Sequence, residues 1–329
     1  MKNGVYIILL LVACMASESL AQQRAQMTHY LFQQLAYNPA YAGARGHLQS
    51  GLSFRSQWMG LEGGPRTAYL NAHGPLRNNR LALGFQSQAD WTGPTQYVNF
   101  QVVYAYRIAL EKVRFSGGIQ VGMENFRADW TELDLENPID DAFPMLASSW
   151  WSPLCGVGVL AQGDRWYAGL SCPFLLEQNL FYESETAMFT QRLRHLYAMG
   201  GAQWQLAADW RFYGATLLSY AWGSKELADG QVQSSPVSWD LYASAFYRDL
   251  LLGGISWQTG LPFWEKGSGL GQTAGLFAVF QLDNGLRFGF SYDLPLSRLA
   301  RPTAGSLEWT MGYEWKVKAK RVAGPRFFW

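Results

Sequence analysis

The sequence predicts an all-β fold: a transmembrane antiparallel β-barrel of about 14 strands, of the outer-membrane type. Two observations favour it, a polar–apolar alternation that repeats along nearly the whole chain and a separation of short from long connections. Side chains on a strand point to opposite faces with a period of two. Few helical stretches are available to cover so much apolar surface. A closed barrel with lipid outside and water inside accommodates both faces.

Residues 305–317 show the alternation most clearly. One face of this predicted strand is apolar and aromatic, while the other carries Glu308, Thr310 and Glu314. The apolar face consists of Leu307, Trp309, Met311, Tyr313, Trp315 and Val317. We expect this strand to close the barrel by pairing with the first strand, near residues 46–58.

The composition agrees with a membrane barrel. Charged residues make up 16% of the 329 residues, against roughly 25% in ordinary soluble domains. The 15 Trp and 17 Tyr are residue types that favour membrane–water interfaces. A formal net charge of +1 gives no reason to expect a nucleic-acid partner.

Residues 1–21 are predicted to be a secretory signal peptide. Lys2 supplies the positive start, and the apolar run from Val5 to Ala13 is too short for a membrane span. Cleavage after Ala21 would leave Gln22 as the mature N-terminus. The alternative is a lipoprotein signal, because Leu11-Val12-Ala13-Cys14 is similar to a lipobox. The remaining divisions are a pre-barrel periplasmic segment, a transmembrane barrel and a C-terminal tail, at residues 22–44, 45–318 and 319–329.

Strands are expected along the whole barrel region, and their even number is typical of single-chain bacterial barrels. Their predicted ranges are 46–58, 65–75, 80–91, 96–110, 112–126, 150–162, 165–175, 192–206, 210–222, 236–247, 250–259, 272–282, 286–294 and 305–317. Alternate connections are short, such as Asp283-Asn284-Gly285, and most of the connections between them are long, such as 127–149. With a periplasmic N-terminus, the short turns would be periplasmic and the long loops extracellular.

The pre-barrel segment is the candidate interaction site. Asn-Pro followed by Gly is turn chemistry, and aromatic residues in a polar tail would otherwise be exposed. We expect the segment to be ordered against the periplasmic side of the barrel and to bind a partner. The alternatives are packing on the barrel mouth and a flexible tail. The candidate partner-binding residues are Tyr30, Phe32, Asn38, Pro39, Tyr41 and Gly43.

Cys155 and Cys172 form a candidate disulfide. A two-residue turn at Gly163-Asp164 would place the two cysteines directly opposite each other, with Cα atoms ~4.5 Å apart. The periplasm and cell surface are oxidising. The alternatives are two thiols that remain reduced, or a bulge or longer turn that shifts the register.

No sequence pattern predicts catalysis, a cofactor or a metal site. The sequence has no Gly-x-Ser-x-Gly and no Cys-x-x-Cys, and its four His lack metal spacing. The acidic run from Glu132 to Asp141 does not have EF-hand spacing and is expected to be a solvated loop. A lipase-type enzyme is therefore disfavoured.

Several short motifs resemble the PorP/SprF family of outer-membrane proteins. They begin with His29-Tyr30-Leu31-Phe32 and Asn38-Pro39-Ala40-Tyr41-Ala42-Gly43, and continue with Gln57–Gly63, His73–Leu76, Gly93–Thr95, Tyr104–Arg107, Phe126–Trp130 and Tyr167–Ser171. One departure is Arg24-Ala25, where the family often has Asp-Pro. The match runs from the mature N-terminus at least to the seventh strand.

The resemblance implies a non-enzymatic component of type IX secretion and gliding motility in the outer membrane. Such a barrel aids the export or surface retention of cargo proteins that carry a C-terminal secretion signal. The implied partners are outer-membrane lipid, other secretion components and the cargo C-terminal domain. The alternative function is a passive outer-membrane diffusion porin, because about fourteen strands leave room for a lumen.

Overall fold

A computed structural model describes residues 27–28, 30–76, 79–129, 148–176, 178–180, 190–192, 194–222, 225–226, 232–233, 237–261, 272–296 and 302–315. The predicted signal peptide and C-terminal tail lie outside these residues. The acidic run from Glu132 to Asp141 lies outside them as well.

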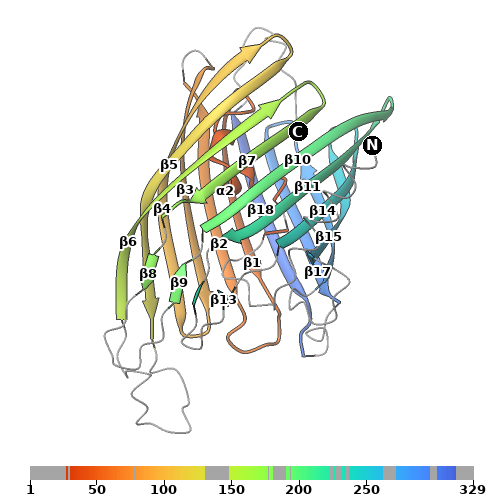
Figure 1. The fold of residues 1–329 in the computed structure, drawn as a ribbon. Coiled ribbons are helices and arrows are strands. Elements are labelled where there is room, and N and C mark those ends of the chain that lie inside the picture. Colours follow the sequence, from red (N-terminus) through yellow and green to blue (C-terminus); the bar gives the residue numbers. More distant parts are fainter. Residues whose placement is uncertain are drawn as a thin grey trace, which may run out of the picture.

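Fourteen antiparallel strands close into one barrel, in which β1 pairs with β18 (Figure 1). The predicted strand number, the pairing of last strand with first and the antiparallel topology are confirmed. The barrel strands are β1 (Leu48–Ser56), β2 (Arg66–Pro75), β3 (Leu81–Thr92), β4 (Thr95–Leu110), β5 (Val113–Ala128), β6 (Ser148–Gln162), β7 (Trp166–Phe174), β10 (Arg194–Ala207), β11 (Trp210–Trp222), β14 (Val237–Tyr247), β15 (Leu251–Leu261), β16 (Thr273–Gln281), β17 (Leu286–Pro295) and β18 (Ser306–Trp315).

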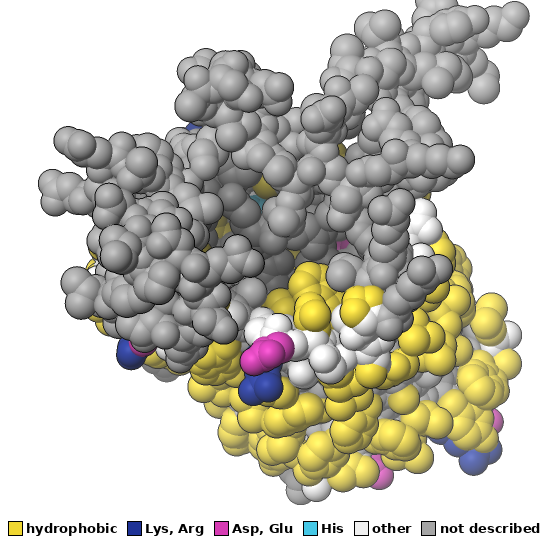
Figure 2. Space-filling view, turned by 90° about the horizontal axis from the view of Figure 1, so that it is seen from below, with side chains coloured by type: hydrophobic (Ala, Val, Ile, Leu, Met, Phe, Trp, Pro, Cys, Tyr) yellow, Lys and Arg dark blue, Asp and Glu magenta, His cyan; other side chains and the backbone are white. Residues whose placement is uncertain are grey.

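The two faces of the wall follow the predicted alternation. On β18, Trp309 is 37% exposed on the outer face, while its neighbour Glu308 is fully buried on the inner face. On β5, Ile119 and Val121 are exposed and Gln120 between them is buried. Figure 2 shows apolar side chains covering the described part of the outer wall that is in view. An apolar outer wall matches the hydrocarbon layer of a membrane.

The short connections form one rim of the barrel. Several depend on positive φ angles, including Glu111, Arg248 and Asp249 at φ 50–56° and Gly285 at φ 95°. Two of the longer connections contain two-stranded hairpins that the alternation did not predict. They pair β8 (Gln178–Leu180) with β9 (Thr190–Arg192), and β12 (Lys225–Glu226) with β13 (Val232–Gln233).

The turn between β6 and β7 differs from the prediction. Gly163 donates its N–H to the Trp166 carbonyl at 2.9 Å, so Asp164 and Arg165 are the central turn residues. This moves the hairpin centre by one residue and the pairing by two. Cys172 therefore lies opposite Val157. The predicted register that placed Cys155 opposite Cys172 is wrong, and the two cysteines do not form a disulfide.

The helical residues among those described are few. They form α2 (Gln34–Tyr37) and the 3₁₀ turn η1 (Pro39–Tyr41), both in the segment before β1. No helix in the described part of the chain is long and apolar enough to cross a membrane.

Candidate functional site

The segment from Met27 to Ala44 occupies the lumen of the barrel. We call its described residues, 27–28 and 30–44, the plug. Nearly all of them are buried, and Tyr30, Asn38 and Ala40 have no exposed surface. Figure 1 shows α2 within the ring of strands. The prediction that this segment lies against the periplasmic side of the barrel is wrong, because the plug lies inside the lumen. Whether the lumen is open or plugged did not follow from the sequence.

Local sequence determines the shape of the plug. The Asn38 side chain caps η1, since its Oδ1 accepts a hydrogen bond from Ala40 N at 2.9 Å. Pro39 starts the turn with the backbone angle that a first helical position needs. Gly43 has a φ of 64°, which favours glycine, and an added Cβ would lie 2.6 Å from the Cβ of Ala82.

Glycines hollow the inner wall where the plug turns. Gly118 on β5 and Gly158 on β6 are directly paired, and both face η1. A Cβ on Gly118 would lie 2.2 Å from Ala40 N, and one on Gly158 would lie 2.2 Å from Asn38 Oδ1. Glycine within a strand often marks close approach of another backbone. The wall and the Asn-Pro turn are therefore complementary in shape.

Asn38 is hydrogen-bonded to the wall as well as to its own turn. Its Nδ2 donates to the Val159 carbonyl at 3.0 Å. Beside it, Ser171 Oγ donates to the Tyr37 carbonyl at 2.6 Å. Each net hydrogen bond contributes about 0.5–1.5 kcal/mol, and an unpaired buried group costs more. These bonds fix the register of the plug against β6 and β7.

Arg107 on β4 holds the end of the plug. Its two terminal nitrogens donate to the carbonyls of Ala42 and Gly43, each at 2.9 Å. Its Nε donates to Ser116 Oγ at 3.0 Å. On the opposite side of the turn, Gly43 N donates to Nδ1 of His73 at 2.9 Å. The planar guanidinium suits this paired recognition, which a lysine could not reproduce.

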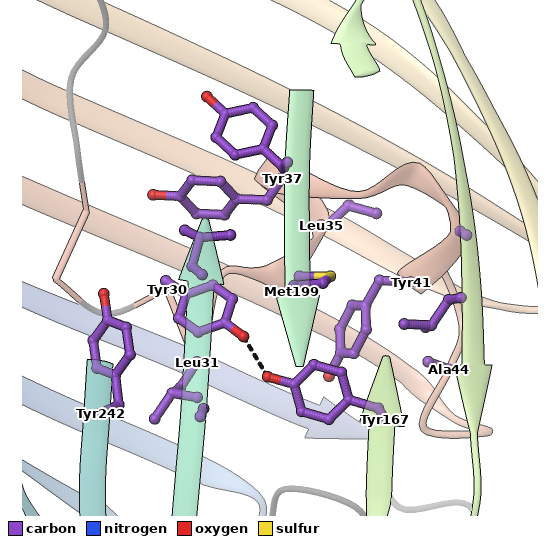
Figure 3. Packing of buried hydrophobic residues seen from close by; sticks show 14 of the residues in the cluster. Tyr30, Leu31, Leu35, Tyr37, Tyr41, Ala44, Tyr167, Met199 and Tyr242 are labelled. Atoms are coloured by element: carbon purple, nitrogen blue, oxygen red, sulfur yellow. Dashed lines mark hydrogen bonds between the residues drawn. The ribbon is translucent and has the colours of Figure 1, made fainter. Parts of the chain in front are cut away.

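Tyrosines pack around the middle of the plug. Tyr30 and Tyr167 of β7 are hydrogen-bonded through their hydroxyls, and Figure 3 shows the two rings pointing toward each other. Tyr37 packs edge-on against Tyr30 at 5.7 Å and against Tyr197 of β10 at 5.3 Å. The Tyr37 hydroxyl accepts a hydrogen bond from Met27 N at 3.2 Å, which joins the first residues of the plug to its middle.

Charged groups join the plug to the strands that close the barrel. Arg45, directly after the plug, forms a buried ion pair with Glu314 of β18. Arg287 of β17 is 3.3 Å from the same carboxylate. Glu314, at the seam between β1 and β18, thus joins this seam to Arg45 after the plug and to Arg287 on β17.

A second cluster of charged side chains lies at the other end of the plug. Thr28 N donates to Glu308 Oε2 at 2.8 Å, and the Thr28 hydroxyl is bonded to Asp293. Arg55 of β1 contacts Asp293 at 2.6 Å and Glu308 at 3.2 Å. This group links β1, β17 and β18 to the first residues of the plug.

The two ends of the plug lie at opposite rims. Thr28 contacts Glu308 and Asp293, which are near the strand ends that adjoin the long loops. Ala44 leads into β1 at Leu48, beside the short turns. The plug therefore crosses the barrel from the long-loop rim to the short-turn rim. The sequence had predicted that this segment would remain on one side of the barrel.

Other inward side chains also fill the lumen. Gln86 Nε2 donates to Gln101 and Gln120, each at 3.2 Å, and Tyr69 donates to Gln86 at 2.6 Å. A residual void beside Thr28 has a volume of about 10 Å³, room for about one water molecule. The described lumen is packed with protein.

The structure brings the six candidate partner-binding residues together inside the barrel. Five are buried and Phe32 is half-buried. Tyr30, Asn38, Tyr41 and Gly43 contact residues of the barrel wall. None is presented to a partner while the plug is in the lumen. Sequence reasoning missed the wall residues that hold them. The signal was present in inward-facing glycines and one inward arginine, namely Gly118, Gly158, Gly169 and Arg107.

No metal centre is visible in the described residues, which contain no group of three or more His, Cys, Asp or Glu placed to hold an ion. The plug is held in the lumen by packing and hydrogen bonds. The closed sheet and its apolar outer wall define a barrel of the outer-membrane type.

Comparison with known proteins identifies the family. The family model for the type IX secretion system membrane protein PorP/SprF matches residues 19–313. The chain belongs to this family. No match is found among curated protein sequences.

Outer-membrane barrels are among the similar solved structures. The CymD monoaromatic hydrocarbon channel has a TM-score of 0.54 at 13% identity, with 86% of this chain and 92% of that chain covered. A Pseudomonas aeruginosa FadL homologue has a TM-score of 0.48 at 10% identity, with 84% and 91% covered. At 13% identity, the likeness to CymD concerns the barrel fold alone.

The glycine hollow gives a stability prediction with a matched control. Gly118→Ala should destabilise the folded barrel by about 1–3 kcal/mol, because the new methyl overlaps the plug backbone. Gly117→Ala on the same strand should be nearly neutral, since nothing lies within 4 Å of its added Cβ. Urea unfolding of the purified protein in lipid vesicles measures both. Equal losses would contradict the fit between plug and wall.

The path of the plug gives a topology prediction. An epitope inserted before Met27 should be reached by antibody from the same side of the membrane as an epitope in the 57–65 loop. The reason is that Thr28 lies beside the long-loop rim. An epitope in the Asp283–Gly285 turn should be reached from the other side. Labelling of the Met27 epitope together with the Asp283–Gly285 epitope would refute the path.

Proposed function

We propose that this protein is a non-enzymatic component of type IX secretion that aids the export or surface retention of a cargo protein. The cargo would carry a C-terminal secretion signal, and its C-terminal domain would be a partner. Membership of the PorP/SprF family supports this role, and that family's description names the secretion system. The same membership implies that other secretion components associate with the barrel in the outer membrane.

The observation that carries the proposal is the filled lumen. A passive porin needs a continuous aqueous path, as barrels of roughly 16–18 strands provide. Here the plug is bonded to β4, β6, β7 and β18, and Gln86 and its neighbours fill further space. A barrel closed by its own chain is suited to act as a membrane-embedded binding partner. The porin alternative is correspondingly disfavoured.

Outer-membrane placement follows from the exposed apolar wall and the family. Outward residues such as Val159 and Leu170 are 57% and 61% exposed, which is a surface for lipid rather than water. The lipid partner is therefore the bilayer around the barrel. The proposed cargo and machinery contacts lie at the two rims, because the outer wall is in lipid and the lumen is filled.

A deletion strain tests the proposed role against the porin alternative. Loss of this protein should leave the cargo unexported or unattached to the cell surface, and the uptake of small hydrophilic solutes should be unchanged. Expression of the wild-type chain should restore surface cargo, measured by immunoblotting of cell-surface and medium fractions. Normal cargo with reduced solute uptake would overturn the proposal and favour the porin.

A further inference from the structure

An apolar groove of about 490 Å³ hollows the outer wall across β6, β7, β10, β11 and β14. We call it the wall groove. Its rim consists of outward side chains, several of which are strongly exposed, such as Leu170 at 61% and Leu196 at 39%. The outward residues that line it include Val157, Val159, Leu170, Leu196, Ala198, Leu218 and Tyr220.

The wall recedes here because β7 leaves the regular ladder. The last regular β6–β7 pair is Val157 with Cys172, and the β7–β10 pairing shifts register between His195 and Tyr197. Pro173 has no N–H to donate, and its carbonyl accepts from the inward-facing Gln120 at 2.8 Å. Cys172, although on the outer face, is only 7% exposed. Small side chains at Cys172 and Ala198 therefore leave a depression between larger neighbours.

Two polar residues of the lining, Ser171 and Tyr197, face the lumen and not the groove. Ser171 Oγ donates to the plug at Tyr37 O, and the Tyr197 ring packs against the Tyr37 ring in the lumen. No charged side chain lines the groove. The groove therefore offers dispersion contacts and excludes ligands that need a charge partner.

We propose that the wall groove holds one hydrocarbon chain of an outer-membrane lipid. The groove is continuous with the lipid-facing wall, so the bilayer is the phase that reaches it. Its volume lies within the range of roughly 300–1,000 Å³ of small-ligand sites. A hydrocarbon chain seated there contacts Leu170, Leu196 and the small floor at Ala198, and it fills a gap that would otherwise lack partner atoms.

Photolabelling in nanodiscs tests the proposal. The purified full-length protein is reconstituted with a phospholipid that carries a diazirine in one acyl chain, irradiated, digested and read by mass spectrometry. Adducts should concentrate on the peptides that contain Leu170 and Leu196. Ala198→Phe should lower that labelling about tenfold, the equivalent of about 1.4 kcal/mol, because the phenyl ring takes the space of the acyl chain.

Ala278→Phe is the matched control. Ala278 also faces outward, opposite the exposed Phe290, but lies on β16 away from the groove, so labelling at Leu170 and Leu196 should be unchanged. Ala198→Leu provides a smaller filling residue if the phenylalanine variant does not fold, and it should also reduce labelling. Adducts spread evenly around the wall, or equal labelling in groove-filled and control variants, would overturn the proposal. So would a photoreactive residue at Leu170 that links to protein rather than lipid in native membranes.

Discussion

A closed barrel with a polar inner wall must either hydrate that wall or satisfy it with protein. This constraint determines the rest of the structure. Here the chain satisfies part of its own wall, with the plug bonded at Arg107, at Val159 through Asn38 and at Glu308 through Thr28. Unpaired buried polar groups cost more than a formed bond returns. The inner wall and the plug therefore depend on each other, and neither is complete alone.

The same contacts couple the plug to closure of the barrel. Arg45 and Thr28, at the two ends of the plug region, bond to carboxylates on β18, the strand that pairs with β1. The Asn38–Ala40 turn of the plug packs on the paired glycines Gly118 and Gly158 of β5 and β6. One short segment thus contacts both the last strand, β18, and strands β4, β6 and β7. These contacts stabilise the closed form of the sheet.

The alternation of residues was enough to predict the wall. Phe288 and Phe290 are exposed and Arg287 is buried, as a period of two requires, and the even strand number and the closing pair followed from the same pattern. The contents of the lumen did not follow. The Asn38-Pro39 turn was visible in the sequence, but the hollow that receives it exists only because the β5–β6 register places Gly118 beside Gly158.

Register was also the reason that the cysteine pairing failed. Glycine and aspartate were expected to form the turn after β6, whereas Gly163 pairs with Trp166 and leaves Asp164 and Arg165 as the turn. Local composition does not distinguish turns that differ by one residue, and only the packing of β7 against both neighbours decides between them. The sequence also could not decide where the aromatic residues of the pre-barrel segment are buried, because burial inside the barrel and burial at its mouth require the same composition.

The central claim is that residues 27–44 close the barrel, and conductance in planar bilayers tests it most directly. The full-length protein should show no steady open-channel current. A variant that lacks residues 22–44, checked for a folded heat-modifiable barrel on gels, should conduct ions, because the contacts that fill the lumen are removed. A wide, steady conductance from the full-length protein, or a folded deletion variant that stays closed, would contradict the account.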